Sequence, residues 1–253
     1  MKKIFFVLIF VIFHVSIFAG EDEDLLKKVD SLASYFDTDF SGTYTIVQDK
    51  PGQTRSVTVA EVSRRDSKEL YTMIIKQPII SRGQGYLKQS DTLWFYDPQS
   101  KKFNSTSSTD RFQNSNARNS DFTRSTLAED YKVEKGENVT LGQYKCRLLT
   151  LFTSSKGVTY PRMKVWVSED SLVRKTEDYS LSGQLLRTSL IPDYYQIGDR
   201  YVPKAILFID ALRGAKISGK FQNEKTQITI TDPSFKKIKD SVFSKAHLER
   251  ERF

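Results

Sequence analysis

The sequence has few of the side chains on which catalysis and covalent cross-linking most often depend. Its 253 residues include one cysteine and two histidines. A single cysteine excludes an internal disulfide and the thiol clusters of structural zinc and iron–sulfur sites. His14 lies in an N-terminal apolar run, so a mature chain would keep only His247. That excludes Ser-His-Asp and Cys-His catalysis and histidine-based metal sites. The sequence therefore predicts no catalytic residue, no metal and no cofactor.

Other chemical signatures are missing as well. The stretch Arg82-Gly83-Gln84-Gly85 has only two glycines and precedes a strand, which is the wrong context for a dinucleotide-binding loop. Carboxylates are plentiful, but no pattern places a pair in one cleft, and a hydrolase with two carboxylates stays an open alternative. Lys and Arg exceed Asp and Glu by 39 to 31, yet they are spread evenly along the chain. No nucleic-acid partner is expected from that distribution.

The N-terminus has the layout of a secretory signal peptide. Met1-Lys2-Lys3 precedes an apolar run that ends in small residues before the acidic cluster 21–24. The run is short for crossing a bilayer of about 30 Å, so we expect cleavage after Ala19 or Gly20 rather than an uncleaved anchor helix. Glu21 stands where a lipoprotein would carry cysteine. Residues 1–20 are thus predicted to be a signal peptide, and the mature protein to be periplasmic and not lipid-anchored.

After this run the hydrophobic pattern starts as a helix and continues as strands. Apolar residues recur at spacings of three and four, which predicts one amphipathic helix over residues 23–38. The period then changes to two and stays there, and Cys146 is expected to be a small buried residue of a strand. The predicted strands occupy residues 43–47, 55–62, 69–75, 85–89, 92–96, 132–139, 144–152, 163–167, 172–179, 184–190, 201–208, 217–221 and 226–230.

Three segments interrupt the strands or follow them. Residues 104–126 form a long polar loop, which tends to be functional or mobile, and lead into a short predicted helix near 120–128. Residues 213–214 are predicted to be a hairpin turn, and the basic tail 233–253 to be mostly irregular. There is no βαβ alternation and no internal repeat. The sequence therefore predicts a mainly β fold, with one large, strongly curved antiparallel sheet and two or three helices on one side, as a single domain over residues 21–253.

The aromatic content of 12% has two interpretations. Many of these residues fall on predicted strands or beside them, where they supply a large apolar area. In one interpretation they are ordinary core. In the other, a half-open barrel of this size leaves an apolar hollow that binds a ligand.

The order of several segments resembles a known family. Residues 86–98, YLKQSDTLWFYDP, followed by Ser120-Asp121-Phe122-Thr123 and then Asp130-Tyr131, are similar to the signature of the outer-membrane lipoprotein-sorting proteins, the LolA-like family. Its later pattern is matched by residues 163–167, 182–188, 194–195 and 200–204. The resemblance covers about residues 25–250. In one departure, residues 114–119 replace the Gly-rich, Met-containing stretch of the family, so we expect this loop to contact its partner differently.

The resemblance implies an unclosed, half β-barrel of the LolA/LolB type, lidded by helices. Such a protein would bind acyl chains of lipoproteins or free lipid and carry them across the periplasm toward the outer membrane, between an inner-membrane exporter as donor and an outer-membrane acceptor. We expect a monomer and no enzymatic activity. The candidate lining of the hollow is Trp94, Tyr96, Phe103, Phe122, Leu127, Trp166, Tyr179, Tyr195 and Phe208, and the candidate lid residues are Leu25, Val29, Leu32 and Phe36.

Two other functions stay open at this point. The first is a non-enzymatic envelope scaffold that holds a partner protein on the curved sheet. The resemblance also extends to accessory proteins of RND-type lipid exporters, in which case the cargo would be a free lipid. The second is an enzyme, for which the sequence offers no identifiable pair of catalytic groups.

Overall fold

The computed structural model describes residues 18–89, 91–153, 155 and 157–250. The predicted signal peptide, residues 1–20, lies almost wholly outside the described residues. Within them, no helix combines the length and the apolar character that crossing a membrane requires.

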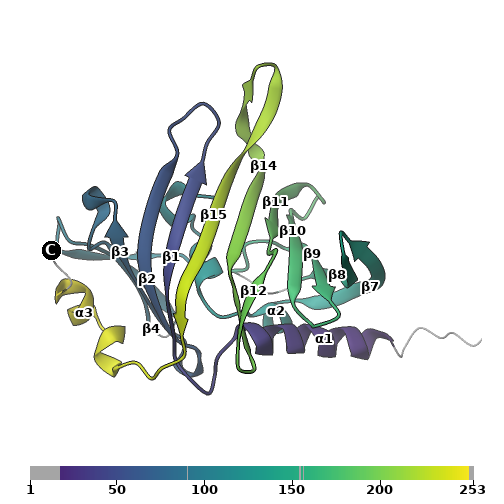
Figure 1. Ribbon diagram of the computed structural model, residues 1–253, viewed down its shortest axis with the longest axis horizontal. Helices are drawn as coiled ribbons and strands as arrows, with labels where there is room; N and C mark the ends of the chain where they lie inside the picture. The colour runs from purple at the N-terminus through teal and green to yellow at the C-terminus, as the bar shows by residue number, and fades with distance from the viewer. Residues whose placement is uncertain (1–17, 90, 154, 156, 251–253) are drawn as a thin grey trace, which may run out of the picture.

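One antiparallel sheet of thirteen strands organises the chain (Figure 1). Its strand order is β6-β5-β4-β3-β2-β1-β15-β14-β11-β10-β9-β8-β7. The strands are β1 (Phe40–Asp49), β2 (Ser56–Arg65), β3 (Leu70–Gln77), β4 (Gly85–Gln89), β5 (Thr92–Asp97), β6 (Lys102–Thr106), β7 (Lys132–Leu141), β8 (Tyr144–Phe152), β9 (Arg162–Ser168), β10 (Val173–Tyr179), β11 (Leu185–Leu190), β14 (Ala205–Ile217) and β15 (Lys220–Ser234). A separate hairpin consists of β12 (Tyr194–Ile197) and β13 (Arg200–Pro203).

The last strand joins the two halves of the sheet. β15 pairs with β1 on one side and with β14 on the other, so that the first six strands and the later ones form one layer. The sheet does not close, because β6 and β7 are its two edges. The mainly β, unclosed antiparallel fold predicted from the sequence is confirmed.

Two segments cover the face of the sheet that we call the inner face. Helix α1 (Phe18–Ala33) lies over the β7–β10 half, where Leu26 and Val29 pack against Leu149 and Val165. The segment 107–126 lies over the other half. Its Phe112 and Phe122 belong to the larger core, which also contains side chains of β1–β4, β14 and β15. The two short helices are α2 (Leu127–Asp130), beside α1, and α3 (Lys245–Arg250), on the opposite, outer face (Figure 1).

Helix α1 ends earlier than the hydrophobic period predicted. It stops at Ala33, whose carbonyl oxygen accepts a hydrogen bond from Arg64 at 3.2 Å. The backbone amide of Tyr35 donates a hydrogen bond to a carboxylate oxygen of Asp66 at 2.8 Å. Arg64 and Asp66 form a buried ion pair, with 2.6 Å between Nη2 and Oδ2. Tertiary partners thus take over the backbone groups that would have continued the helix.

Three other segments differ from the sequence-based expectation. The loop 104–126 is held in place: Arg111 pairs with Asp210 at 2.8 Å, and the amide of Asn116 donates to Thr226 at 3.0 Å. The predicted turn at 213–214 lies inside β14, where a Cβ on Gly214 would come within 2.1 Å of the Gln222 carbonyl oxygen. The turn falls instead at 218–219, between β14 and β15. The tail contains α3, whose Leu248 is fully buried.

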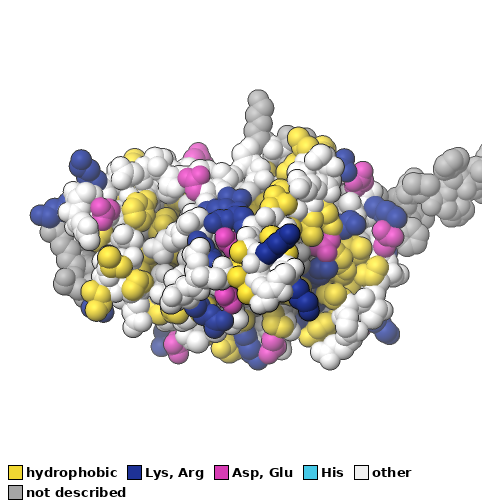
Figure 2. All heavy atoms as spheres, turned by 90° about the horizontal axis from the view of Figure 1, so that it is seen from above, with side chains coloured by type: hydrophobic (Ala, Val, Ile, Leu, Met, Phe, Trp, Pro, Cys, Tyr) yellow, Lys and Arg dark blue, Asp and Glu magenta, His cyan; other side chains and the backbone are white. Residues whose placement is uncertain are grey.

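Six strand connections lie at one end of the sheet, among them β5–β6 and β8–β9, and we call the other four the upper rim. They are β1–β2 (residues 50–55), β3–β4 (78–84), β10–β11 (180–184) and β14–β15 (218–219). Figure 2 views the molecule from this side and shows hydrophobic side chains interspersed with Lys and Arg. The β14–β15 hairpin projects beyond the other strands of the rim (Figure 1).

Candidate functional site: a cavity beneath helix α1

A cavity of about 520 Å³ lies between the inner face of the sheet and the covering segments. That volume is within the range of small-molecule binding sites, about 300–1,000 Å³. Strands, helices and the β12–β13 hairpin all contribute to its apolar wall. The aliphatic part of this wall consists of Val29, Leu32, Ala33, Leu127, Val158, Met163, Leu172, Val173, Ile191, Val202, Pro203, Ile206, Ile228 and Ile230. The aromatic part consists of Phe40, Tyr35, Tyr44, Tyr131, Tyr160, Tyr194 and Tyr201.

A second part of the lining is polar and combines Ser and Thr hydroxyls with four basic and two acidic side chains. Most of it comes from residues 108–109, 120–121, 123–126 and 130 and from Arg64, Lys88 and Arg187. Arg124 donates to both Glu69 and Glu129, and Lys88 donates to Glu69 at 3.0 Å. These hydrogen bonds hold the pKa of Glu69 below its usual range. One wall is thus apolar and the other carries fixed charges, which suits a ligand that is itself amphiphilic.

The N-terminal half of α1 is bound to the sheet by two carboxylates. Asp22 forms a bidentate pair with Arg147 of β8, at 2.7 and 2.9 Å, and Glu23 accepts the amide of Val133 in β7. Gly136 makes the first contact possible, because a Cβ there would lie 2.0 Å from a carboxylate oxygen of Asp22. The covering helix is therefore attached to strands at the β7 edge.

A third carboxylate joins α1 to α2. Asp30 accepts the amides of Leu127 and Ala128 at 3.0 and 2.7 Å, as well as the hydroxyl of Ser125. It therefore acts as the N-terminal cap of α2 from another helix, and satisfies donors that a short helix leaves free. Burial raises the pKa of Asp30, and the three hydrogen bonds only partly oppose that shift.

Arg187 forms the polar floor between the cavity and the segment 107–126. Its guanidinium pairs with Asp178 at 2.7 Å and with Asp121 at 2.6 Å, and lies over the rings of Tyr160 and Phe208. Burial raises the pKa of Asp178, an effect that Arg187 opposes. Although burial disfavours the charge of Arg187, the two carboxylates raise its pKa well above the usual value. The arginine stays charged and fastens the segment to β10 and β11.

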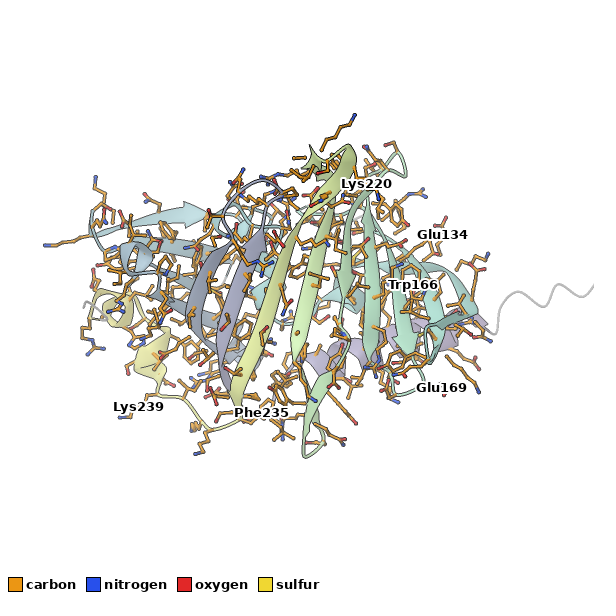
Figure 3. The ribbon with its side chains drawn as sticks, turned by 45° about the horizontal axis from the view of Figure 1, so that its top comes forward. Glu134, Trp166, Glu169, Lys220, Phe235 and Lys239 are labelled. Carbon is orange, nitrogen blue, oxygen red and sulfur yellow. The ribbon has the colours of Figure 1, made fainter. Side chains whose placement is uncertain are left out.

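Eight of the nine predicted lining residues do not line the cavity, and five of these eight lie on the outer face. Tyr96 is fully buried in a cluster on the outer face with Trp94 and Phe103, beneath Leu248 of α3. Trp166 lies on β9, as Figure 3 labels it, and packs under Lys175 with 4.3 Å from Nζ to the ring centre. Tyr179 contacts Lys164 in the same way. Side chains of a strand alternate between faces, and these five residues have the outward parity.

The other four predicted lining residues are on the inner side. Leu127 lines the cavity itself. Phe122 and Phe208 are buried in the adjoining core, and Tyr195 packs against that core from β12.

The four predicted lid residues lie in three different environments. Val29 and Leu32 line the cavity, and Leu25 packs partly buried in the core under α1. Phe36 comes after the end of the helix and is 54% exposed, with Arg124 over its ring.

Sequence reasoning missed the aliphatic wall and the charged floor. Ile206, Ile228 and Ile230 alternate along β14 and β15, which indicates a buried face but not what covers it. In the sequence, Arg187 resembles any other arginine of a strand. Its partner Asp121 lies 66 positions earlier in the chain, in the 107–126 segment, and only the fold brings it beside Asp178 of β10. Aromatic residues were favoured because of their size, and seven do line the cavity beside the aliphatic residues, but none of these seven was among the predicted lining residues.

The fold is that of the LolA superfamily. The LolA superfamily protein NE2245 from Nitrosomonas europaea is 24% identical, with a TM-score of 0.73 over 89% of this chain and 98% of that one. A protein domain from Vibrio parahaemolyticus named for outer membrane lipoprotein sorting is 19% identical, with a TM-score of 0.79 over 92% and 100%. A DUF1329 family protein from Desulfovibrio piger is 17% identical, with a TM-score of 0.77 over 91% and 98%.

These comparisons confirm, at the level of the fold, the resemblance seen in the sequence. The chain belongs to the family whose model matches residues 67–250 and is described as that of an uncharacterized protein. No curated protein matches the sequence.

Proposed function

We propose that this protein is a non-enzymatic periplasmic carrier, which binds acyl chains of a lipoprotein or lipid in the cavity beneath α1 and moves them toward the outer membrane. The cavity is the observation that carries the proposal, because its apolar wall and its polar, charged opposite side match the two ends of an amphiphile. The proposal includes the cleaved signal peptide over residues 1–20, a single domain over 21–253, and transfer between an inner-membrane donor and an outer-membrane acceptor as a monomer. Similarity in fold to a LolA superfamily protein and to a domain named for outer membrane lipoprotein sorting supports it.

The energetics of acyl chains set what such a carrier has to provide. Each buried methylene contributes about 0.8 kcal/mol, so a chain of typical length gains roughly 10 kcal/mol from burial before the costs of binding. A membrane offers a similar gain. The binding free energy of a carrier has to match that value approximately. The carrier can then take up cargo from the donor and still release it to the acceptor.

Extraction of the purified, folded protein with organic solvent, followed by mass spectrometry, tests whether a lipid is carried. We expect a lipid with one or more acyl chains in stoichiometric amount after expression with export. Protein without lipid that also fails to bind added fatty acids would contradict the carrier and favour a scaffold.

A series of fatty acids of increasing length tests where they bind. Affinity should rise about fourfold per methylene until the cavity is full, since about 1.4 kcal/mol corresponds to a factor of ten. Ile206→Asp places a carboxylate in the apolar wall and should lower the affinity by at least about tenfold. Trp166→Ala, on the outer face, is the matched control and should leave it unchanged. Equal affinities of both variants would place the binding elsewhere.

A further inference from the structure

The upper rim gathers exposed apolar side chains from connections that are far apart in the sequence. Nine large hydrophobic side chains are exposed among the described residues, and six of them lie on the rim or within a few residues of it. These six are Val57, Ile79, Ile80, Leu181, Leu212 and Phe221. Ile79 and Ile80 are 81% and 78% exposed and stand side by side on a 3-10 turn between β3 and β4. A polar connection would serve equally well to join two strands, so these side chains need another explanation.

The same rim carries much of the positive charge of the protein. Residues 49–57, 76–84, 180–184 and 211–222 contain seven Lys and Arg and one Asp, whereas the whole chain has a net charge of +8. Some of this charge is paired: Arg55 with Asp49, Lys76 with Glu61, and Arg213 with Glu224. Lys216 and Lys220 belong to the projecting β14–β15 hairpin, whose tip Figure 3 marks by Lys220. Basic residues that are far apart in the sequence thus give the upper rim a positive net charge.

We propose that the upper rim docks on an anionic lipid bilayer, with its apolar tips entering the interface and its Lys and Arg facing the headgroups. The chemistry of the rim favours a bilayer over a protein partner. Its apolar side chains are distributed over four separate connections with basic residues between them, whereas a protein interface needs a packed central patch. A fluid bilayer accepts separate apolar tips one by one, and anionic headgroups attract each nearby Lys or Arg.

Co-sedimentation with vesicles tests this proposal. Binding of the full mature chain should be strong to vesicles of phosphatidylethanolamine with phosphatidylglycerol and weak to phosphatidylcholine alone. It should fall when the salt concentration is raised, because the charges act through water. I79S/I80S and K216E/K220E should each lower the partition coefficient by about tenfold or more. Both pairs are exposed, so melting temperatures should stay those of the wild type.

Matched controls come from the opposite end of the sheet. I197S, at the tip of the β12–β13 hairpin, and K236E/K237E, past the end of β15, should bind vesicles like the wild type. Equal binding of rim and control variants, or equal binding to neutral and anionic vesicles, would overturn the proposal. Retention by an acidic protein with no vesicle binding would assign the rim to a protein partner instead.

The proposal is separate from cargo binding, and the same variants distinguish the two. I206D should bind vesicles normally while losing fatty acid affinity. I79S/I80S should show the reverse. Failure of both activities in one folded variant would contradict the separation of the rim from the cavity.

Discussion

At Arg187 a single buried side chain connects three segments of the chain. It lies on β11, and its partners are Asp178 on β10 and Asp121 in the segment over the inner face. A buried ion pair of this kind adds little to folding stability compared with apolar side chains of the same volume. Removing the arginine alone, however, leaves negatively charged carboxylates without a partner in a poorly solvated site. One oxygen of Asp178 already lacks a hydrogen-bond partner. The position is therefore expected to be sensitive to loss of the charge rather than to loss of the side-chain volume.

Arg187→Met keeps most of the side-chain stem and removes the charge. We expect it to lower the free energy of unfolding by about 3–5 kcal/mol at pH 7, measured by urea denaturation. The matched control Arg55→Met removes an exposed pair with Asp49 and should cost less than about 1 kcal/mol.

The pH dependence of Arg187→Met follows from the direction of the pKa shift of Asp178. Its folded pKa is raised by burial, so the folded state binds a proton more readily than the unfolded state, and stability falls as pH rises through that pKa. Removing Arg187 raises this pKa further, and the destabilisation should shrink between pH 7 and pH 5. A cost that is the same at both pH values would contradict the assignment to Asp178.

At the scale of single elements, α1 is attached by carboxylates rather than by apolar packing alone. Asp22 and Glu23 bind the strands near the β7 edge, and Asp30 caps α2. Because these polar contacts can exchange with water, the main cost of lifting α1 from the sheet as a lid is the exposure of Leu26 and Val29.

Asp30→Ala should loosen α1 and α2 together. We expect a loss of about 1–2 kcal/mol in stability, as for removal of a helix cap, and faster amide hydrogen exchange at residues 124–131. A fluorescent fatty acid bound in the cavity should dissociate several-fold faster. The control is Asp24→Ala on the same helix, where the carboxylate is exposed and pairs with Lys27. Equal dissociation rates for the two variants would show that Asp30 does not hold the lid.

The elements also show what could be predicted from the sequence and what could not. Strand positions followed from alternation, and residues 85–89 and 144–152 were predicted with their observed bounds. Alternation identifies two faces of a strand but not which face is covered by the rest of the chain. Trp94 and Tyr96 were assigned inward, whereas Leu93 of the same strand contributes to the inner core. Choosing the face requires knowing where α1, α3 and the 107–126 segment pack, and those contacts are long-range.

At the scale of the whole molecule, the order of strands creates properties that no local segment has. The insertion of β15 between β1 and β14 brings Ile228 and Ile230 opposite α1 to complete the cavity wall. It also extends the β14–β15 hairpin at the upper rim, beside the connections at 50–55 and 78–84. The polar segment 104–126 was expected to be functional or mobile, but its Phe112 and Phe122 are buried in the core on the inner face. The remaining cavity is therefore smaller than the sheet alone would allow.

The separation of cavity and outer face predicts a specific fluorescence result. Both tryptophans, Trp94 and Trp166, lie on the outer face, so a brominated fatty acid bound in the cavity should leave intrinsic fluorescence almost unquenched. A variant with W94F, W166F and L32W carries one tryptophan in the cavity wall, and its fluorescence should be strongly quenched by the same ligand. The W94F variant, which retains only Trp166, is the control. Quenching of Trp166 with none at position 32, in proteins that both fold and bind the ligand, would place the acyl chain on the outer face and contradict the carrier site beneath α1.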